Sequence, residues 1–342
     1  MSVKIYNNVS LLDLNSFGIE ANAKELCFLR NKNELLNFAQ NFNSTKKYLI
    51  LGGGNNVLFT KDFDGLIIKN NIKSRKIVFE DDKKLLLRIG AGENWAEIVK
   101  YCIGKNLWGI ENLAHIPADT GGAVVQNIGA YGAEIQDVVV SVEVFDLTYK
   151  ITRIYSKEQC QFAYRNSIFK QNKNLLITMV DISLPKIPKI NRSYKDIDEF
   201  LAKNGIKNPT SAQIAEMVTD IRKSKLPEVK ELGNVGSFFK NPVISEEKLQ
   251  ELLTNFPDIP HYTAAGMPDD MSLHKISSAW LIENCGWKGY REGDAGVYNK
   301  HSLILVNYGN ASGKEIVNLM TKIQRSVAEK FNISLEAEAV IV

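Results

Sequence analysis

Short apolar runs separated by one helical pattern occupy the first 70 positions of this 342-residue chain. The runs Tyr48 to Leu51 and Leu66 to Ile68 have the length of strands, and the apolar residues between Asn33 and Asn43 recur at helical spacing. Strands that alternate with a helix predict a small α/β unit in this part of the chain.

Strand patterns dominate between about residues 77 and 190, in the runs IVF, LLLRIG, VVVSVEVFDL, ITRIYS and LLITMVDISLP. One helical pattern interrupts them around Asn94 to Cys102. A helix from Thr210 to Lys225 follows, because a Thr/Ser cap opens it and Pro227 stops it. We expect a larger α+β unit with a domain boundary near residue 226.

The C-terminal part begins with the loop-like segment ELGNVGSFFKNP. We expect helices that start at Ser245 and near Leu273, then the strand SLILVN, then a last helix opened by a capping box from Ser312 to Glu315. The final segment alternates, so that one face of a strand can pack while the other carries the carboxylates. One face would carry Leu335, Ala337, Ala339 and Ile341, and the opposite face would carry Glu336 and Glu338.

Composition and charge are those of an ordinary globular protein, with 44% hydrophobic and 24% charged residues. The net charge of +3 is too small to indicate a nucleic-acid partner. The four cysteines lie far apart without a C-x-x-C pair, which indicates neither a metal site nor a disulfide framework. The N-terminus has no apolar signal segment and no run of about 18 apolar residues occurs, so we expect a cytoplasmic protein without a membrane span.

One basic cluster interrupts this balanced charge and consists of Lys69, Lys73, Arg75 and Lys76. Three acidic residues follow at once, Glu80, Asp81 and Asp82. Opposite charges in such close succession favour a solvated hairpin over an anion site.

The first candidate for ligand chemistry is the segment YLILGGGNNVLF, in which Gly52 to Gly54 follow an apolar strand and precede Asn55 and Asn56. Glycine permits positive φ and has no Cβ, so successive amides can form a nest around phosphate oxygens, although a plain turn fits equally well. A dinucleotide-binding G-x-G-x-x-G would need glycine at Val57, and no Gly-Lys-Ser/Thr follows for a P-loop. A phosphate cradle of another fold remains.

A second glycine-rich segment is IPADTGGAVVQNIGAYGAEIQ, which contains Gly121, Gly122, Gly129 and Gly132 and little charge. Such a stretch can supply the other wall of a pyrophosphate site. By itself it is equally compatible with a structural loop or a bulged strand.

Seven motifs together resemble one family. They are NSFGIEANA (15–23), ILGGGNNVLF (50–59), GAGENW (90–95), QNIGAYG (126–132), FAYRNSIFK (162–170), GSFFKNP (236–242) and FNISLEAE (331–338). In order and spacing they resemble the UDP-N-acetylenolpyruvoylglucosamine reductase (MurB) family over nearly the whole chain. Each motif alone is weak, but seven in register are highly specific.

The resemblance implies an α+β protein with the FAD-binding fold of vanillyl-alcohol oxidase and p-cresol methylhydroxylase, in two subdomains, plus a C-terminal α+β substrate-binding domain. The subdomains would span residues 1–70, joined by the C-terminal strand at about 333–342, and residues 71–226; the substrate-binding domain would span 227–332. FAD would be bound non-covalently. By resemblance its pyrophosphate would be cradled by Gly52, Gly53, Gly54, Asn55, Asn56, Gly121, Gly122, Gly129, Ala130 and Tyr131.

The resemblance also implies the reaction, which is the reduction of UDP-N-acetylglucosamine enolpyruvate to UDP-N-acetylmuramate in peptidoglycan precursor synthesis, with NADPH as hydride donor. Arg165 of YRNS, Ser237 of GSFF and Glu338 of LEAE match the family's catalytic positions. Hydride from flavin N5 to C3 leaves a carbanion or enol at C2. Arg165 and a protonated Glu338 would stabilise that charge, and Ser237 would supply the proton to C2.

Four further residues match substrate-binding positions of the family: Tyr194, Lys225, Asn241 and His301. Tyr194 marks the class with an extra substrate-covering loop. We expect no metal, no nucleic-acid or membrane partner and no obligatory protein partner, in a bacterial cytoplasm.

Two departures from the family pattern affect these expectations. The family usually has I-P-G-x-V-G where this chain has IPADTG, so Ala118 replaces a glycine and Asp119 adds a charge near the pyrophosphate. Alanine adopts a strongly positive φ only at a cost, which puts the local backbone and the FAD affinity in question. The terminal L-E-P-E motif has Ala337 in place of proline, which should matter little on an edge strand.

Two alternatives to this reductase stay open from the residues alone. Flavoenzymes of the same fold that oxidise an alcohol or hydroxy acid often attach flavin through His or Cys; neither glycine-rich loop contains such a residue, although His115 stands just before the second. A redox-inactive UDP-sugar-binding protein would have no need to keep all three catalytic residues. A serine hydrolase is excluded, because G-x-S-x-G would need glycines at Val235 and Phe239.

Overall fold

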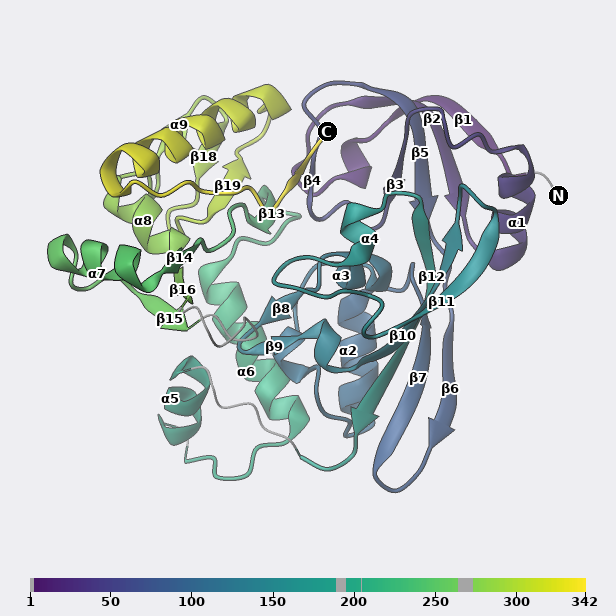
Figure 1. The fold of residues 1–342 in the computed structure, drawn as a ribbon, viewed down its shortest axis with the longest axis horizontal. Helices are drawn as coiled ribbons and strands as arrows, with labels where there is room; N and C mark the ends of the chain where they lie inside the picture. The colour runs from purple at the N-terminus through teal and green to yellow at the C-terminus, as the bar shows by residue number, and fades with distance from the viewer. Residues whose placement is uncertain (1–2, 189–194, 204, 264–272) are drawn as a thin grey trace. The chain divides into compact units, whose positions relative to one another are not determined.

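The computed structural model describes residues 3–188, 195–203, 205–263 and 273–342, in two compact units (Figure 1). The first unit consists of Met1–Val9, Ala23–Gly54 and Phe63–Ser224. The second consists of Ser10–Asn22, Asn55–Asp62 and Lys225–Val342. Two short N-terminal segments therefore fold with the C-terminal part of the chain. The predicted three-domain boundaries stay a prediction.

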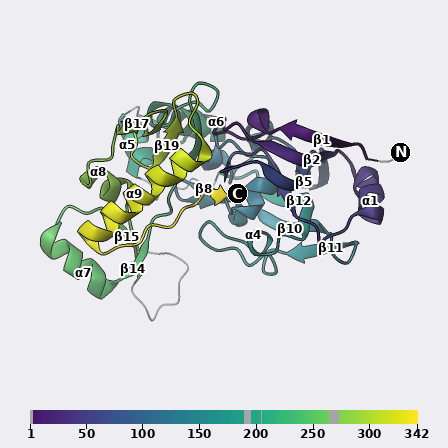
Figure 2. The same ribbon diagram turned by 90° about the horizontal axis from the view of Figure 1, so that it is seen from above.

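The first unit contains a four-stranded sheet of order β1-β2-β5-β3. Its strands are β1 (Ile5–Ser10), β2 (Asn22–Leu29), β5 (Phe63–Asn70) and β3 (Tyr48–Leu51). Figure 2 shows β1, β2 and β5 side by side. Strand β5 is parallel to both neighbours, and α1 (Lys32–Asn41) makes the crossover that parallel strands need. The strands and helix predicted for this region are confirmed.

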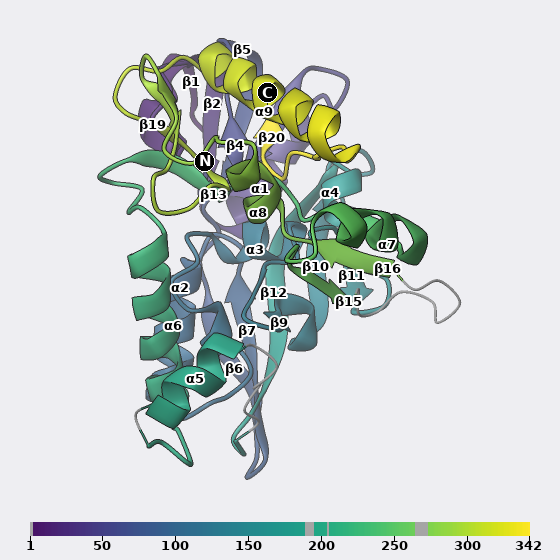
Figure 3. The ribbon, with the colours of Figure 1, turned by 90° about the vertical axis from the view of Figure 1, so that its left-hand side faces the viewer.

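The same unit contains a five-stranded antiparallel sheet of order β11-β10-β12-β7-β6. All five predicted runs form strands: β6 (Arg75–Glu80), β7 (Lys84–Gly90), β10 (Val139–Asp146), β11 (Ile151–Ser156) and β12 (Leu175–Pro185). Helices α2 (Trp95–Gly104) and α6 (Ser211–Lys225) share one apolar core with this sheet and lie on the same side of it in Figures 1 and 3. The amphipathic strands therefore have one face covered by helices.

Short elements connect this sheet to its helices. They are α3 (Thr120–Val125), α4 (Ile168–Gln171), α5 (Lys195–Lys203), the hairpin strands β8 (Gly129–Ala130) and β9 (Ala133–Glu134), and the 3-10 turns Glu111–Leu113 and Ile135–Asp137. The second glycine-rich segment belongs to this connecting layer, and Gly52–Gly54 of the first lie in the loop after strand β3, so neither set of glycines is part of a long strand. Backbone there is free to approach a ligand.

The second unit has sheets of order β13-β19-β18-β17 and β14-β16-β15, and the pair β20-β4. The strands are β4 (Val57–Leu58), β13 (Gly233–Ser237), β14 (Val243–Ser245), β15 (His261–Thr263), β16 (Leu273–Ile276), β17 (Arg291–Glu292), β18 (Ala295–Val297), β19 (Ile304–Asn307) and β20 (Val340–Ile341). The helices are α7 (Glu246–Asn255), α8 (Ser278–Asn284), α9 (Gly313–Phe331) and the 3-10 turn Leu12–Leu14. Helix α9 buries an apolar stripe of Ile316, Leu319, Ile323 and Val327, and its predicted capping box is present.

Two expectations for this unit are wrong in detail. The helix predicted near Leu273 begins at Ser278, because residues 273–276 instead pair as β16 with β14 and β15. The C-terminal alternation holds for Leu335 and Ala339, which are buried, but Ile341 is 41% exposed. Among the described residues, strand β20 pairs with the two-residue strand β4 alone, which leaves Ile341 at its end exposed.

All four cysteines are free thiols, and three of them are buried. Burial raises the pKa of Cys27, Cys102 and Cys160 to about 12, so these thiols stay protonated and unreactive at neutral pH. Within the described ranges no helix is long and apolar enough to cross a membrane. The same ranges contain no cluster of three or more His, Cys, Asp or Glu side chains that could hold a metal ion.

Candidate active site

The first candidate element is the GGG loop, residues Gly52–Gly54, which directly follows strand β3. Gly54 has a φ of +71°, a left-handed conformation that favours glycine. A Cβ added to Gly52 would lie 3.8 Å from Asp119 Oδ2 and 3.9 Å from the Gly122 amide nitrogen. The GGG loop therefore lies against the ADTGG loop, residues 118–122, of the second glycine-rich segment.

The ADTGG loop is held by the segment that joins β7 to α2. The Gly121 amide donates to the Ala91 carbonyl at 2.8 Å, and a Cβ on Gly121 would lie 2.9 Å from the Ala91 Cβ. A Cβ on Gly122 would meet nothing within 4 Å, so the backbone is open there. The ADTGG loop thus has one glycine fixed against Ala91 and one with open backbone, and together with the adjoining GGG loop it fits the pyrophosphate of a dinucleotide.

The departures from the family pattern leave this backbone relaxed. Ala118 is not among the residues with positive φ, so the replaced glycine has no steric consequence. Asp119 is extended, with φ −88° and ψ 153°. Burial raises the pKa of its carboxyl, while the charge and hydrogen bond of Lys69 lower it.

The solvated-hairpin interpretation of the basic cluster holds for Lys73, Arg75 and Lys76, which are exposed, and is wrong for Lys69. The side chain of Lys69 is only 13% exposed; its ammonium donates to the Gly52 carbonyl and lies 3.4 Å from Asp119 Oδ2. The reason is topological, because Lys69 pairs in β5 with Leu51, the last residue of β3 before the GGG loop.

The predicted flavin residues Gly129, Ala130 and Tyr131 belong to the β8-β9 hairpin. Tyr131 (φ +48°) and Gly132 (φ +79°) form its two-residue turn. Positive φ at both central positions is the type I′ geometry, which matches the twist of a hairpin. The Asn112 side-chain amide donates to the Tyr131 carbonyl at 2.8 Å and holds the turn in place.

Arg165, predicted to be catalytic, lies in the first unit between β11 and α4. The Arg165 Nη2 donates to the Gly129 carbonyl at 2.6 Å, and the Arg165 carbonyl accepts from Lys170 Nζ at 3.2 Å. Its φ is +54°, which is strained for a residue with a side chain. The fold thus brings a predicted catalytic residue against a predicted flavin residue.

Arg222 is a candidate site residue that motif comparison does not find. Its Nε, on α6, donates to the His115 carbonyl at 3.1 Å. Burial lowers the pKa of its guanidinium, Tyr131 opposes that shift, and the charge of Arg165 adds to it. Two neighbouring guanidinium groups favour an anion. A sequence signal exists, because Arg222 continues the four-residue spacing of the buried face of α6.

Ser237 and Glu338 lie on adjacent segments of the second unit. Ser237 ends strand β13. The Glu338 amide donates to the Phe238 carbonyl at 2.8 Å, and Phe239 and Ala337 form an antiparallel bridge. The fold therefore brings together two predicted catalytic residues, Ser237 and Glu338, that are far apart in the chain.

Asn55 and Asn56, predicted to contact the flavin, fold with the second unit. The Asn55 side chain donates to Ser16 Oγ at 3.0 Å, and the Asn56 side chain donates to the Glu338 carbonyl at 3.2 Å. Asn56 thus anchors the segment that carries Glu338. Their role toward FAD stays a prediction.

Lys225 and His301 lie near one another in the second unit. Burial lowers the pKa of His301, and the positive charge of Lys225 lowers it further. The Leu303 amide lies 3.3 Å from His301 Nδ1 and donates to it, so the neutral imidazole carries its proton on Nε2. A cation beside an imidazole N–H is a suitable pair of donors for a phosphate or carbonyl oxygen.

The other two predicted substrate residues are less informative. The Asn241 side-chain oxygen accepts from the Ser278 amide at 3.0 Å, which orients this amide at the start of α8. Tyr194 lies outside the described residues.

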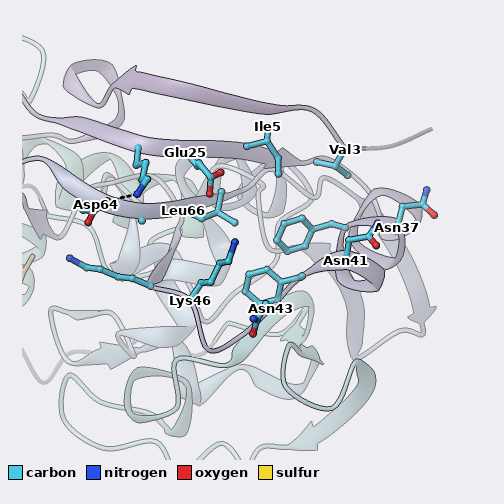
Figure 4. Close-up of a pocket in the computed structure, with 14 residues that line it drawn as sticks. Val3, Ile5, Glu25, Asn37, Asn41, Asn43, Lys46, Asp64 and Leu66 are labelled. Atoms are coloured by element: carbon cyan, nitrogen blue, oxygen red, sulfur yellow. Dashed lines mark hydrogen bonds and ion pairs between the residues drawn. The ribbon is translucent and has the colours of Figure 1, made fainter.

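A pocket of about 510 Å³ lies between α1 and the strands β1, β2 and β5 of the first unit (Figure 4). Phe38, Phe42 and Leu66 line it, and the ion pair Lys24–Asp64 (3.0 Å) lies at its side. Of the predicted site residues that the structure describes, none lines this pocket. It is separate from the candidate flavin loops.

Comparisons with known proteins agree with this geometry. One family model, an FAD binding domain, matches residues 25–154; another, the C-terminal domain of UDP-N-acetylenolpyruvoylglucosamine reductase, matches residues 227–342. A curated UDP-N-acetylenolpyruvoylglucosamine reductase of Flavobacterium johnsoniae is 42% identical over 99% of this chain and 100% of its own. One of Amoebophilus asiaticus is 41% identical over 99% of both. The chain belongs to the UDP-N-acetylenolpyruvoylglucosamine reductase family.

The crystal structure of the UDP-N-acetylenolpyruvylglucosamine reductase of Thermus caldophilus has a similar fold, with a TM-score of 0.68 and 25% identity over 100% of this chain and 99% of that one. The predicted family, the α+β FAD-binding fold with a C-terminal domain, and FAD as the cofactor of an oxidoreductase are confirmed. The GGG and ADTGG loops fall within the FAD-binding match, and Ser237 and Glu338 fall within the reductase match. The individual residue roles stay predictions.

Proposed function

We propose that this chain reduces UDP-N-acetylglucosamine enolpyruvate to UDP-N-acetylmuramate, with NADPH as the hydride donor, in the cytoplasmic synthesis of peptidoglycan precursors. The observation that carries the proposal is the pairing of the C-terminal segment with residues 236–239, the GSFF segment, which sets Glu338 beside Ser237. Family membership and the fit of the GGG and ADTGG loops to a pyrophosphate support it.

When bound, FAD supplies a hydride to C3 of the enolpyruvyl group after its own reduction by NADPH. The substrate then carries extra negative charge at C2 and its carboxylate. The guanidinium of Arg165 would bind this charge, and the neighbouring Arg222 adds a second cation. Arg165 and Arg222 thus form the electrostatic part of the proposed site.

The proton that C2 needs would come from Ser237. Its hydroxyl is a weak acid in water, so it can act only if it is held at C2. A protonated Glu338 would donate a hydrogen bond to the same charge. Lys225, Asn241 and His301 would bind the UDP-sugar, with the Lys225 ammonium suited to the diphosphate. The products are UDP-N-acetylmuramate and NADP⁺.

Replacement of Ser237 by alanine tests this assignment by separating the two half-reactions. NADPH should still reduce the flavin at nearly the native rate, because the hydroxyl acts only after hydride has left for C3. Reoxidation by the enolpyruvyl substrate should slow by about 10²- to 10⁴-fold, the effect of a lost general acid. Stopped-flow absorbance at the flavin band resolves both phases.

Ser10→Ala is the control, because Ser10 is an exposed serine of the same unit, and both rates should stay native. Unchanged reoxidation in Ser237→Ala, or equal slowing of both phases, would show that Ser237 is not the proton donor.

A further inference from the structure

The ammonium of Lys69 lies at the junction of the two glycine loops. It donates to the carbonyl of Gly52 in the GGG loop and lies 3.4 Å from the carboxylate of Asp119 in the ADTGG loop. Both side chains are largely buried, with 13% and 15% of their surface exposed. This ion pair is therefore shielded from solvent, unlike the exposed pair Lys24–Asp64 of the same unit.

Asp119 has little other reason to be ionised where it lies. It occupies the position before α3, yet its side chain makes no capping hydrogen bond to that helix. Lys69 makes the hydrogen bond to its carboxylate, and Lys73 contributes a more distant positive charge. The Asp119 carboxylate in the loop is thus compensated by the ammonium of Lys69, which lies on strand β5.

The position of this carboxylate matters for the cofactor. A Cβ on Gly52 would lie within 3.8 Å of Asp119 Oδ2, so the carboxylate adjoins the loops that fit a pyrophosphate. Two like charges in such a largely buried place repel each other more strongly than they would in bulk water, because the effective dielectric is lower there. An uncompensated carboxylate beside the pyrophosphate would therefore weaken FAD binding strongly.

We propose that Lys69 is a positioning residue for FAD: it neutralises Asp119 and thereby allows the two glycine loops to accept a pyrophosphate. The inference rests on the proposed role of these loops in FAD binding. It assigns a cofactor-related role to a basic residue that belongs to none of the glycine motifs, and it explains how this chain tolerates an acidic residue in the second loop.

The test is the affinity of apoprotein for FAD and for riboflavin, measured by quenching of flavin fluorescence. Lys69→Met should raise the Kd for FAD at least about tenfold, because Asp119 is then uncompensated. Asp119→Asn should bind FAD at least as tightly as the wild type. The double variant should return to within about threefold of the wild type, since it removes both charges.

Riboflavin separates charge from shape, because it lacks the pyrophosphate. Lys69→Met should leave its Kd within about threefold of the wild type, whereas a distorted site would weaken both ligands alike. Lys24→Met is the matched control, as it removes a paired lysine from an exposed ion pair on the same sheet, and it should not change either Kd.

Native FAD affinity in Lys69→Met, or a double variant as weak as Lys69→Met, would overturn the inference. If Lys69→Met does not fold, the Asp119→Asn variant still tests the inference. An FAD Kd more than about threefold above that of the wild type in this variant would contradict the proposed role of Lys69, because removal of the carboxylate should not weaken FAD binding. Wild-type apoprotein that takes up no FAD would instead refute the proposed cofactor site. The two failures are therefore distinguishable.

Discussion

Single residues around the candidate flavin site adopt backbone conformations that ordinary side chains avoid. Tyr131 and Arg165 both have positive φ, at +48° and +54°. Each such residue costs on the order of 1–3 kcal/mol and persists only where its surroundings hold it. Side-chain hydrogen bonds from Asn112 and Lys170 to their carbonyls do so here. The strain is consistent with side chains that must be pre-positioned for a ligand.

At the same scale, the pair Lys225 and His301 gives a prediction. Because burial and the charge of Lys225 both lower the pKa of His301, Lys225→Met should raise that pKa toward the ordinary value near 6.5. NMR titration of the His301 ring resonances measures it. The variant should also bind the UDP-sugar at least about tenfold more weakly while its FAD content stays native.

Lys288 provides the control for this pair, because its charge also lowers the pKa of His301, as a smaller cause than Lys225. Lys288→Met should therefore raise the pKa less than Lys225→Met. An unchanged His301 pKa in Lys225→Met would contradict the proximity, and parallel loss of FAD would contradict the assignment of Lys225 to the substrate.

At the scale of elements, the start of helix α9 decides how well this long helix forms. Ser312 Oγ accepts from the Glu315 amide, and the Glu315 carboxylate accepts from the Ser312 amide at 2.7 Å. Both ends of the capping box are thus satisfied. The next residue, Gly313, packs so closely that an added Cβ would lie 1.9 Å from the Phe59 carbonyl oxygen.

Ser312→Ala should lower the free energy of unfolding by about 1 kcal/mol, the usual effect of a lost N-cap. Gly313→Ala should destabilise more, because backbone must move to admit the methyl group. Urea unfolding followed by circular dichroism measures both. Ser326→Ala, in the middle of the same helix, is the control and should change stability by less than about 0.5 kcal/mol. Ser312→Ala as stable as this control would show that the cap is dispensable.

At the scale of the whole molecule, stability depends on separate apolar cores and on the few charges buried in them. Glu111 is 3% exposed in the first unit, and the Gly109 amide donates to its carboxylate at 2.6 Å. Burial raises the pKa of Glu111, while hydrogen bonds from backbone amides partly oppose the shift. Ionised Glu111 therefore costs the folded state free energy at neutral pH.

The consequence is a pH-dependent stability difference. A carboxyl with a raised folded-state pKa contributes stability that is complete below its unfolded pKa, near 4.3, and is lost as pH rises through the folded-state pKa. The stability of Glu111→Gln relative to the wild type should therefore increase from about pH 5 to about pH 8. Glu97→Gln, at an exposed carboxylate of α2, should follow the wild type across this range. A constant difference between Glu111→Gln and the wild type would contradict the pKa shift.

Local patterns in the sequence were sufficient for most elements and for the family. The strand runs, the α9 capping box and the seven motifs depend on neighbours within a few positions, where periodicity and capping act directly. Motif order also identified FAD and the reductase family, because register over the whole chain is specific even when each motif is weak. The failures at this level, such as the helix expected near Leu273, arose where strand pairing with distant segments overrode local preference.

Only the tertiary structure decided which distant residues meet. The pairing of the C-terminal segment with the GSFF segment sets Glu338 beside Ser237, and the parallel alignment of β5 with β3 places Lys69 at the GGG loop. Neither contact can be recognised from neighbouring residues in the sequence, because both depend on strands or segments that are far apart in the chain. Charge balance along the chain, for example, does not indicate which carboxylate a lysine side chain contacts. The sequence by itself therefore determined the family and the candidate residues, whereas long-range strand pairing determined their neighbours, their burial and hence their charges.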